Sequence, residues 1–108
     1  MSDTFNAVRA LVTEGKVHIS EHGYDELAAD NILVLDVLNG VDSGLVVEDY
    51  PQFAKGPSVL VLQTDALGRP IHVLWGIPRG RVEPAVLVTA YRPDPTRWTD
   101  DLMKRKQR

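Results

Sequence analysis

Two histidines and one tyrosine are the residues in this chain best suited to acid–base chemistry: His22, His72 and Tyr91. Histidine is the side chain most readily poised for proton transfer near neutral pH, and a tyrosine hydroxyl can act as a proton donor. We predict that His22 and His72 face a common groove on one side of a sheet, with Tyr91 beside them. The alternative is structural, because a lone histidine in a helix or strand is more often hydrogen-bonded to backbone.

Three arginines are candidates for holding the phosphate groups of a substrate. Arg92 directly follows Tyr91, and Arg79 and Arg81 lie in the turn Pro78-Arg79-Gly80-Arg81. The fork of a guanidinium group matches the oxygens of a phosphate, which makes arginine a frequent phosphate ligand. For Arg79 and Arg81 the competing interpretation is a solvated hairpin tip without a ligand.

The sequence lacks the motifs of several other site classes. It contains no cysteine, and its three histidines do not have the spacing of metal ligands. It contains no glycine-rich phosphate loop, no serine nucleophile elbow and no dinucleotide fingerprint. We therefore expect neither a metal nor a cofactor.

Four apolar runs must position these candidates. Runs bounded by proline, glycine and turn residues predict strands, here an antiparallel meander over residues 45–50, 58–63, 71–77 and 85–91. His72 lies in the third strand and Tyr91 ends the fourth. Pairing places His72 opposite either Ala90 or Tyr91, and a register shift of one residue decides between them.

Helices are expected mainly before these strands. Apolar residues at helical spacing predict a first helix capped by Asp3 or Thr4, a second one from Ser20 to about Asp30, and a third over residues 32–39. Residues 16–20 predict a short strand or bridge, and Thr96 or Thr99 could start a final short helix. The expected fold class is α+β: one domain over residues 1–108, with N-terminal helices segregated to one face of a curled antiparallel sheet of about four strands.

Charge is distributed unevenly along the chain. Residues 1–54 carry ten acidic and two basic residues, a net charge of −8, whereas residues 55–108 carry five acidic and ten basic residues, a net charge of +5. Such asymmetry is typical of a surface for nucleic acid or for a protein partner, and a mixed surface is the alternative. No apolar run approaches the roughly 20 residues that span a bilayer, and the first residues are not typical of a signal peptide. A cytoplasmic protein without membrane contact is expected.

A series of short motifs follows one known family in order. They are Ser20-Glu21-His22, Ile32 with Asp36-Val37, Glu48-Asp49-Tyr50-Pro51, Gly56-Pro57-Ser58, Arg69-Pro70-Ile71-His72-Val73, and Thr89-Ala90-Tyr91-Arg92-Pro93-Asp94 with Trp98. From about residue 17 to residue 98 the chain resembles the small bacterial family called domain of unknown function 4258. That family looks like a distant relative of the RelE, BrnT and MqsR toxins, which cleave messenger RNA without metal. The resemblance implies an RNA substrate, an antitoxin partner, His22, His72 and Tyr91 as acid–base groups, and Arg92 as a phosphate contact.

The chain departs from the family pattern on the helix that carries His22. Family members usually have arginines at the positions of Glu26 and Asp30, and Glu26 lies one helical turn beyond His22. Carboxylates there would repel an RNA phosphate, so we expect little or no ribonuclease activity. The two hypotheses are therefore a toxin homologue with an endoribonuclease-like scaffold and degenerate activity, and a non-catalytic binding or regulatory module on the same scaffold.

Overall fold

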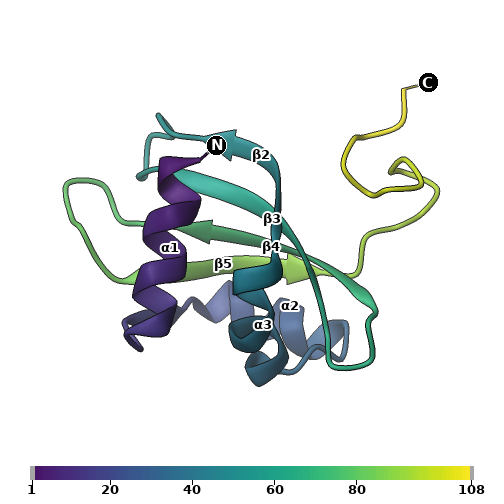
Figure 1. The fold of residues 1–108 in the computed structure, drawn as a ribbon, viewed down its shortest axis with the longest axis horizontal. Coiled ribbons are helices and arrows are strands. Elements are labelled where there is room, and N and C mark those ends of the chain that lie inside the picture. The colour runs from purple at the N-terminus through teal and green to yellow at the C-terminus, as the bar shows by residue number, and fades with distance from the viewer. Residues whose placement is uncertain (1, 108) are drawn as a thin grey trace.

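The computed structural model describes residues 2–107, which form a five-stranded sheet and three α-helices (Figure 1). In chain order the elements are α1 (Asp3–Thr13), β1 (Val17–Ile19), α2 (Glu21–Ala29), α3 (Val34–Gly40), a 3-10 turn (Val41–Ser43), β2 (Leu45–Tyr50), β3 (Ser58–Thr64), β4 (Pro70–Gly76) and β5 (Ala85–Tyr91). The α+β class is confirmed. The sheet has one strand more than expected, and its order is β1-β5-β4-β3-β2.

The antiparallel meander of β2, β3, β4 and β5 is confirmed, and the fifth strand is β1. Val17 and Ile19 of β1 pair in parallel with Ala85 and Leu87 of β5. His72 pairs with Tyr91, which settles the register that the sequence left open. Parallel pairing of a three-residue strand with the last strand depends on how the chain returns to the sheet, and no local pattern encodes it.

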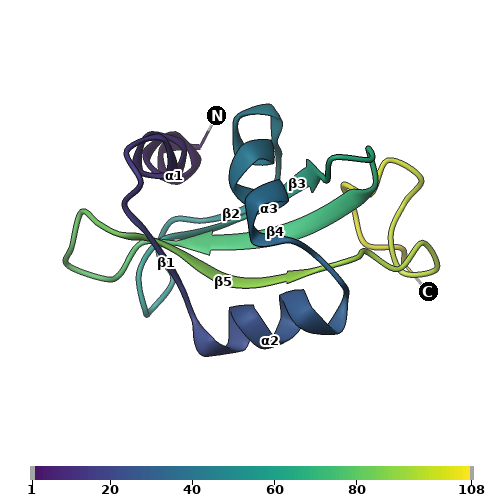
Figure 2. The same cartoon turned by 90° about the horizontal axis from the view of Figure 1, so that it is seen from below.

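One face of the sheet is covered by α1 and α3 (Figure 2). Phe5, Val8 and Leu11 form the buried stripe of α1 and join a single hydrophobic core with alternate residues of β3 and β4, such as Val61 and Val73. Because successive side chains of a strand point to opposite faces, the intervening residues Leu60 and Leu74 face away from these helices.

The second helix, α2, lies along the outer edge of β5 (Figure 2), and its Leu27 joins the same hydrophobic core as the buried residues of α1. Ser20 caps α2 as predicted, since its Oγ accepts from Gly23 N at 2.9 Å and also donates to the Val88 carbonyl at 3.0 Å. Gly23 allows this close approach: a Cβ there would lie 2.8 Å from the Leu87 carbonyl oxygen. The helix therefore packs directly against the backbone of β5 beyond the end of β1.

The expected C-terminal helix is wrong. Residues 93–107, called the C-terminal segment below, form turns and one isolated bridge between Trp98 and Arg105. Short polar side chains occupy the backbone groups that a helix would use: Asp94 accepts from Thr96 N, and Asp101 accepts from Met103 N. Such local bonds compete with helix formation. Arg108 lies outside the described residues.

Candidate functional site

His72 and Tyr91 form a hydrogen-bonded pair at one end of the β4–β5 pairing. Their side chains project from neighbouring strands on the face away from α1, and His72 Nδ1 lies 3.2 Å from the Tyr91 hydroxyl oxygen. His72 Nε2 lies 2.8 Å from the Leu102 carbonyl oxygen in the C-terminal segment. A carbonyl only accepts, so Nε2 carries the proton, and the Tyr91 hydroxyl donates to Nδ1 of the neutral ring.

The C-terminal segment seals His72 from solvent. The Trp98 ring meets the imidazole edge-on at 4.4 Å between centroids, and no part of His72 is exposed. Leu102, whose carbonyl completes the seal, adopts φ +63°, which is uncommon for a leucine. Burial lowers the pKa of His72, and the nearby Arg105 charge lowers it further, whereas the Leu102 carbonyl opposes the shift. His72 is therefore a neutral, inaccessible imidazole.

A second tyrosine and an ion pair lie close to Tyr91. The Tyr50 hydroxyl donates to Glu48 Oε2 at 2.7 Å, and Arg105 donates to Glu48 Oε1. The Arg105 guanidinium also stacks on the Trp98 ring at 4.9 Å. Burial raises the pKa of the Tyr91 phenol, so its hydroxyl stays protonated and could serve as an acid but not as a base. The Glu48 carboxylate accepts hydrogen bonds from Tyr50 and Arg105 and is therefore not available as a base.

An open groove of about 640 Å³ extends along the sheet face next to this cluster. Its floor is formed by Leu60, Leu74, Val86 and Val88 from the three central strands, and Tyr50, Tyr91 and Arg105 contribute to its lining. Phe53, Lys55, Ile77 and Pro78 also line it, from the loops that follow β2 and β4. An open, mostly apolar cavity with a few polar groups is typical of a binding site.

Glycine at position 56 holds two of these loops together. Gly56 adopts φ +126°, and a Cβ there would lie 2.0 Å from the Ile77 carbonyl oxygen. Arg79 N donates to the Lys55 carbonyl at 3.0 Å across the same contact. The loops after β2 and β4 therefore form one wall, which no other residue at position 56 would permit.

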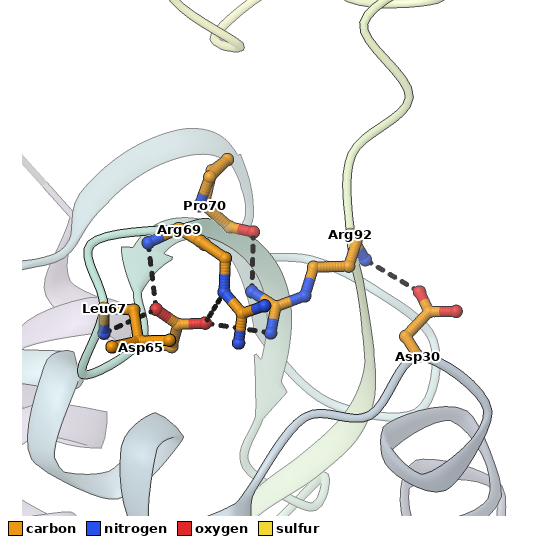
Figure 3. A network of polar contacts seen from close by, with 6 residues as sticks. All are labelled: Asp30, Asp65, Leu67, Arg69, Pro70 and Arg92. Carbon is orange, nitrogen blue, oxygen red and sulfur yellow. Dashed lines mark hydrogen bonds and ion pairs between the residues drawn. The ribbon is translucent and has the colours of Figure 1, made fainter.

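Arg92 is held in a polar network centred on Asp65 (Figure 3). The Asp65 side chain, which is 1% exposed, accepts from Leu67 N, Arg69 N, Arg69 Nε and Arg92 Nη2. Arg92 Nη1 donates to the Pro70 carbonyl at 3.2 Å. Burial alone would raise the pKa of Asp65, but these donors outweigh it and lower the pKa to about 2. Arg92 thus joins the end of β5 to the β3–β4 turn.

Asp30 and Glu26, the acidic departures from the family pattern, have different environments. Asp30 Oδ2 accepts from Arg92 N at 2.8 Å and so ties the end of α2 to the end of β5 (Figure 3). Glu26 lies 3.6 Å from His22 Nε2, and the His22 side chain is 66% exposed. His22 does not line the groove, and neither does His72. The structure brings His72 and Tyr91 together but does not place His22 in a shared groove with them.

Arg79 and Arg81 lie far from the His72–Tyr91 pair. They belong to the exposed loop between β4 and β5, which adjoins the Gly76–Val86 end of the pairing, whereas His72 and Tyr91 lie at the opposite end. Four residues of strand separate the two ends by about 13 Å. Any ligand held by both sites would have to extend along the groove.

Several polar residues of this region were not predicted as important. Asp65 and Arg69 organise the β3–β4 turn, and Gln63 joins α3 to the sheet by donating to the Val37 carbonyl and accepting from Trp75 Nε1. The turn Asp65-Ala66-Leu67-Gly68-Arg69 could have indicated an aspartate that binds the turn amides, whereas Gln63 has no such sequence signature. Among residues 2–107, no three His, Cys, Asp or Glu side chains could hold a metal ion. No helix in the same range is long and apolar enough to cross a membrane.

Comparison with known proteins adds one match. No curated protein and no solved structure matches the sequence. Residues 19–92 match the family model described as Domain of unknown function (DUF4258), and this range contains α2, α3, the four antiparallel strands and both members of the His72–Tyr91 pair. Because the match covers more than half of the chain, the protein belongs to that family of domains of unknown function.

Proposed function

We propose that this protein is a non-catalytic binding module, built on a scaffold of the RelE and BrnT type. The observation that carries the proposal is the state of His72. Both of its ring nitrogens are hydrogen-bonded within the protein and none of its surface is exposed, while an open apolar groove lies on the same sheet face. A general base must reach the proton that it removes, and a buried neutral imidazole with no free nitrogen does not.

Electrostatics around the groove also favour binding over catalysis. Cleavage of a phosphodiester requires positive charge where negative charge develops. Arg92 is engaged by Asp65, Arg105 is engaged by Glu48, and the floor of the groove is aliphatic. These groups support contact with an apolar surface more than stabilisation of a dianionic transition state.

Fluorescence of 1-anilinonaphthalene-8-sulfonate with the purified protein tests the proposal. We expect enhanced fluorescence with the unmodified protein and its loss in Val86→Asp, which places a charge on the groove floor. Val82→Asp is the matched control, because Val82 is 84% exposed and does not line the groove. Equal fluorescence from the two variants would remove the groove as the binding site.

A metal-independent endoribonuclease is the second candidate, and the position of Tyr91 favours it. The Tyr91 side chain borders both the groove and a neighbouring hollow lined by Trp98, Arg97, Arg105 and Lys106. A protonated phenol between cations could donate to a leaving oxygen. Incubation of the purified protein with messenger RNA separates the two candidates. We expect no cleavage, and cleavage that is lost in Tyr91→Phe or in His22→Ala would establish the enzyme instead.

A further inference from the structure

Positive charge without an ion-pair partner gathers at one end of the groove. Lys55 lines that end, and the backbone contact between Arg79 and Lys55 brings the loop of Arg79 and Arg81 against it. All three residues are exposed, and within residues 2–107 none of their side chains forms a salt bridge. We call Lys55, Arg79 and Arg81 the cationic rim. The loop between β4 and β5 projects beyond the sheet, where an approaching partner would meet it first (Figure 1).

The groove floor and the cationic rim differ in the chemistry that they would recognise. The floor spans three strands, a width of about 10 Å, and exposes aliphatic side chains without hydrogen-bonding capacity. No carboxylate lines the groove, although the N-terminal half of the chain is strongly acidic. A suitable ligand therefore buries apolar side chains on the floor and carries negative charge near the rim.

We propose that the groove binds a short segment of a partner protein in which a few apolar side chains are flanked by carboxylates. This inference rests on the proposed function and names the chemistry of the partner. Apolar side chains gain free energy on the aliphatic floor at about 25 cal/mol per Å² removed from water. Carboxylates next to the cationic rim add specificity and speed association. A polynucleotide would meet the rim but would leave the aliphatic floor without apolar partners.

The choice of a separate partner over a second copy depends on symmetry. Ten of the fifteen acidic residues lie in the N-terminal half of the chain, and none of the fifteen lines the groove, so a groove that bound the acidic surface of a second copy would join two different surfaces, which is a heterologous contact. Such heterologous contacts form rings or open filaments instead of a closed two-fold dimer. A soluble, separate acidic segment satisfies the groove without that consequence.

Fluorescence anisotropy with labelled peptides tests the inference on the whole chain. The probe is a short peptide with a central Leu-Val-Phe flanked by glutamates, compared with the same peptide flanked by lysines and with a poly(U) oligonucleotide. We expect the glutamate peptide to bind at least about tenfold more tightly than the lysine peptide, since each favourable or unfavourable exposed charge contact contributes up to about 1 kcal/mol. Added salt should reduce this preference.

Three substitutions locate the binding. Lys55→Glu should weaken the glutamate peptide about three- to tenfold, and Lys104→Glu, at an exposed position outside the groove, should leave it unchanged. Val86→Asp should abolish binding of both peptides, with circular dichroism confirming that it folds. Equal binding of the two peptides, or tighter binding of the oligonucleotide, would overturn the inference. So would self-association of the protein that is lost in Val86→Asp, because a second copy would then be the occupant.

The proposed function can fail separately from this inference. Loss of dye fluorescence in Val86→Asp together with equal binding of the two peptides would keep the groove as a binding site and reject only the acidic partner. Cleavage of messenger RNA, or dye fluorescence that is unchanged in Val86→Asp, would reject the proposal of a binding module itself.

Discussion

At the level of single residues, environment decides the chemistry of His72 more than residue type does. The same side chain that could act as a base in a cleft is neutral here, because Tyr91 donates to one ring nitrogen and the Leu102 carbonyl accepts from the other. Trp98 covers the remaining surface. His72 therefore joins the C-terminal segment to the sheet, as a buried polar residue with all of its hydrogen bonds satisfied.

The lowered pKa of His72 predicts how stability depends on pH. The unfolded chain takes up a proton near the ordinary pKa of 6.5, whereas the folded protein resists protonation, so unfolding should become easier as the pH falls below 6.5. Urea unfolding at about pH 7.5 and at about pH 5.5 measures this change. His72→Gln should reduce the pH dependence in that range, while His22→Gln, at an exposed position, should preserve it. If the free energy of unfolding changed equally between the two pH values in the unmodified protein and in His72→Gln, His72 would not be the source of the pH dependence.

Asp65 predicts a second pH dependence, in acid. Its pKa is lowered from 3.8 to about 2 in the fold, so its contribution is complete above pH 3.8 and is lost as the pH falls toward 2. Asp65→Asn should lower the unfolding midpoint at neutral pH and flatten the acid side of the stability curve. Asp42→Asn is the control, because Asp42 is exposed and its ion pair with Arg9 is long, at 3.5 Å. If Asp65→Asn lost stability with falling pH as steeply as the unmodified protein, other carboxylates would dominate acid unfolding.

At the level of elements, α2 and the C-terminal segment determine the surroundings of β5 and of the His72–Tyr91 pair. The helix closes the outer side of β5 where β1 ends, through Ser20 and Asp30 at its two termini. The C-terminal segment lies over His72 and holds Arg105 against Glu48. The bonds that Ser20, Asp30 and Arg105 form join residues more than 50 positions apart. The bond between His72 and Leu102 joins residues 30 positions apart.

Gly23→Ala tests the packing of α2 on β5. Helix propensity alone would stabilise this substitution by up to about 1 kcal/mol. The new Cβ would lie 2.8 Å from a backbone oxygen, however, and overpacking of this kind costs about 1–3 kcal/mol, so we expect net destabilisation. Urea unfolding measures the difference, and Asp25→Ala on the exposed side of the same helix is the control. A stabilised Gly23→Ala variant would show that α2 can move away from β5.

Trp98→Ala tests whether the C-terminal segment seals His72. Removal of a buried tryptophan side chain costs about 3–5 kcal/mol in a core, and here it should also open a path to the imidazole. Diethylpyrocarbonate modification followed by peptide mass spectrometry reads out each histidine separately. We expect His18 and His22 to react in both proteins and His72 to react only in the variant. Modification of His72 in the unmodified protein would contradict the sealed site.

On the scale of the whole molecule, the two sides of the sheet are unequal. One side is covered by α1 and α3 and buries the main core, to which α2 contributes Leu27 from the β5 edge (Figure 2). The other side carries the C-terminal segment and the groove between the loop walls. A half-covered antiparallel sheet normally presents polar residues on its open face. The aliphatic floor of the groove departs from that rule, which is the whole-molecule argument for a binding partner.

Amide hydrogen exchange should reveal this unequal construction. β3 and β4 are paired on both sides and contribute buried residues such as Val61 and Val73 to the core, so their amides should exchange most slowly. β2 lies at the edge of the sheet and the C-terminal segment is held by few elements, so both should exchange faster. Faster exchange in β4 than in β2 would contradict this order of stability.

Local patterns predicted most of the elements. The strands Leu45–Tyr50 and Ala85–Tyr91 have the predicted bounds, and Ser20 caps α2 as predicted. These features depend on propensity, periodicity and capping within a few residues, all of which are visible in sequence. The prediction of a final helix was wrong because the side chains of Asp94, Thr99 and Asp101 accept from backbone amides in turns, which the helical spacing of Trp98 and Leu102 does not reveal.

The sequence by itself determined the α+β class, the meander, and the family to which the chain belongs. Only the tertiary structure decided the environments of the candidate residues. His72 pairs with Tyr91 and is covered by Trp98. His22 is exposed beside Glu26, and Arg92 forms an ion pair with Asp65. The physical reason is that accessibility and protonation depend on neighbours brought from distant parts of the chain. Periodicity records which face of an element is apolar, but not which segment will cover it.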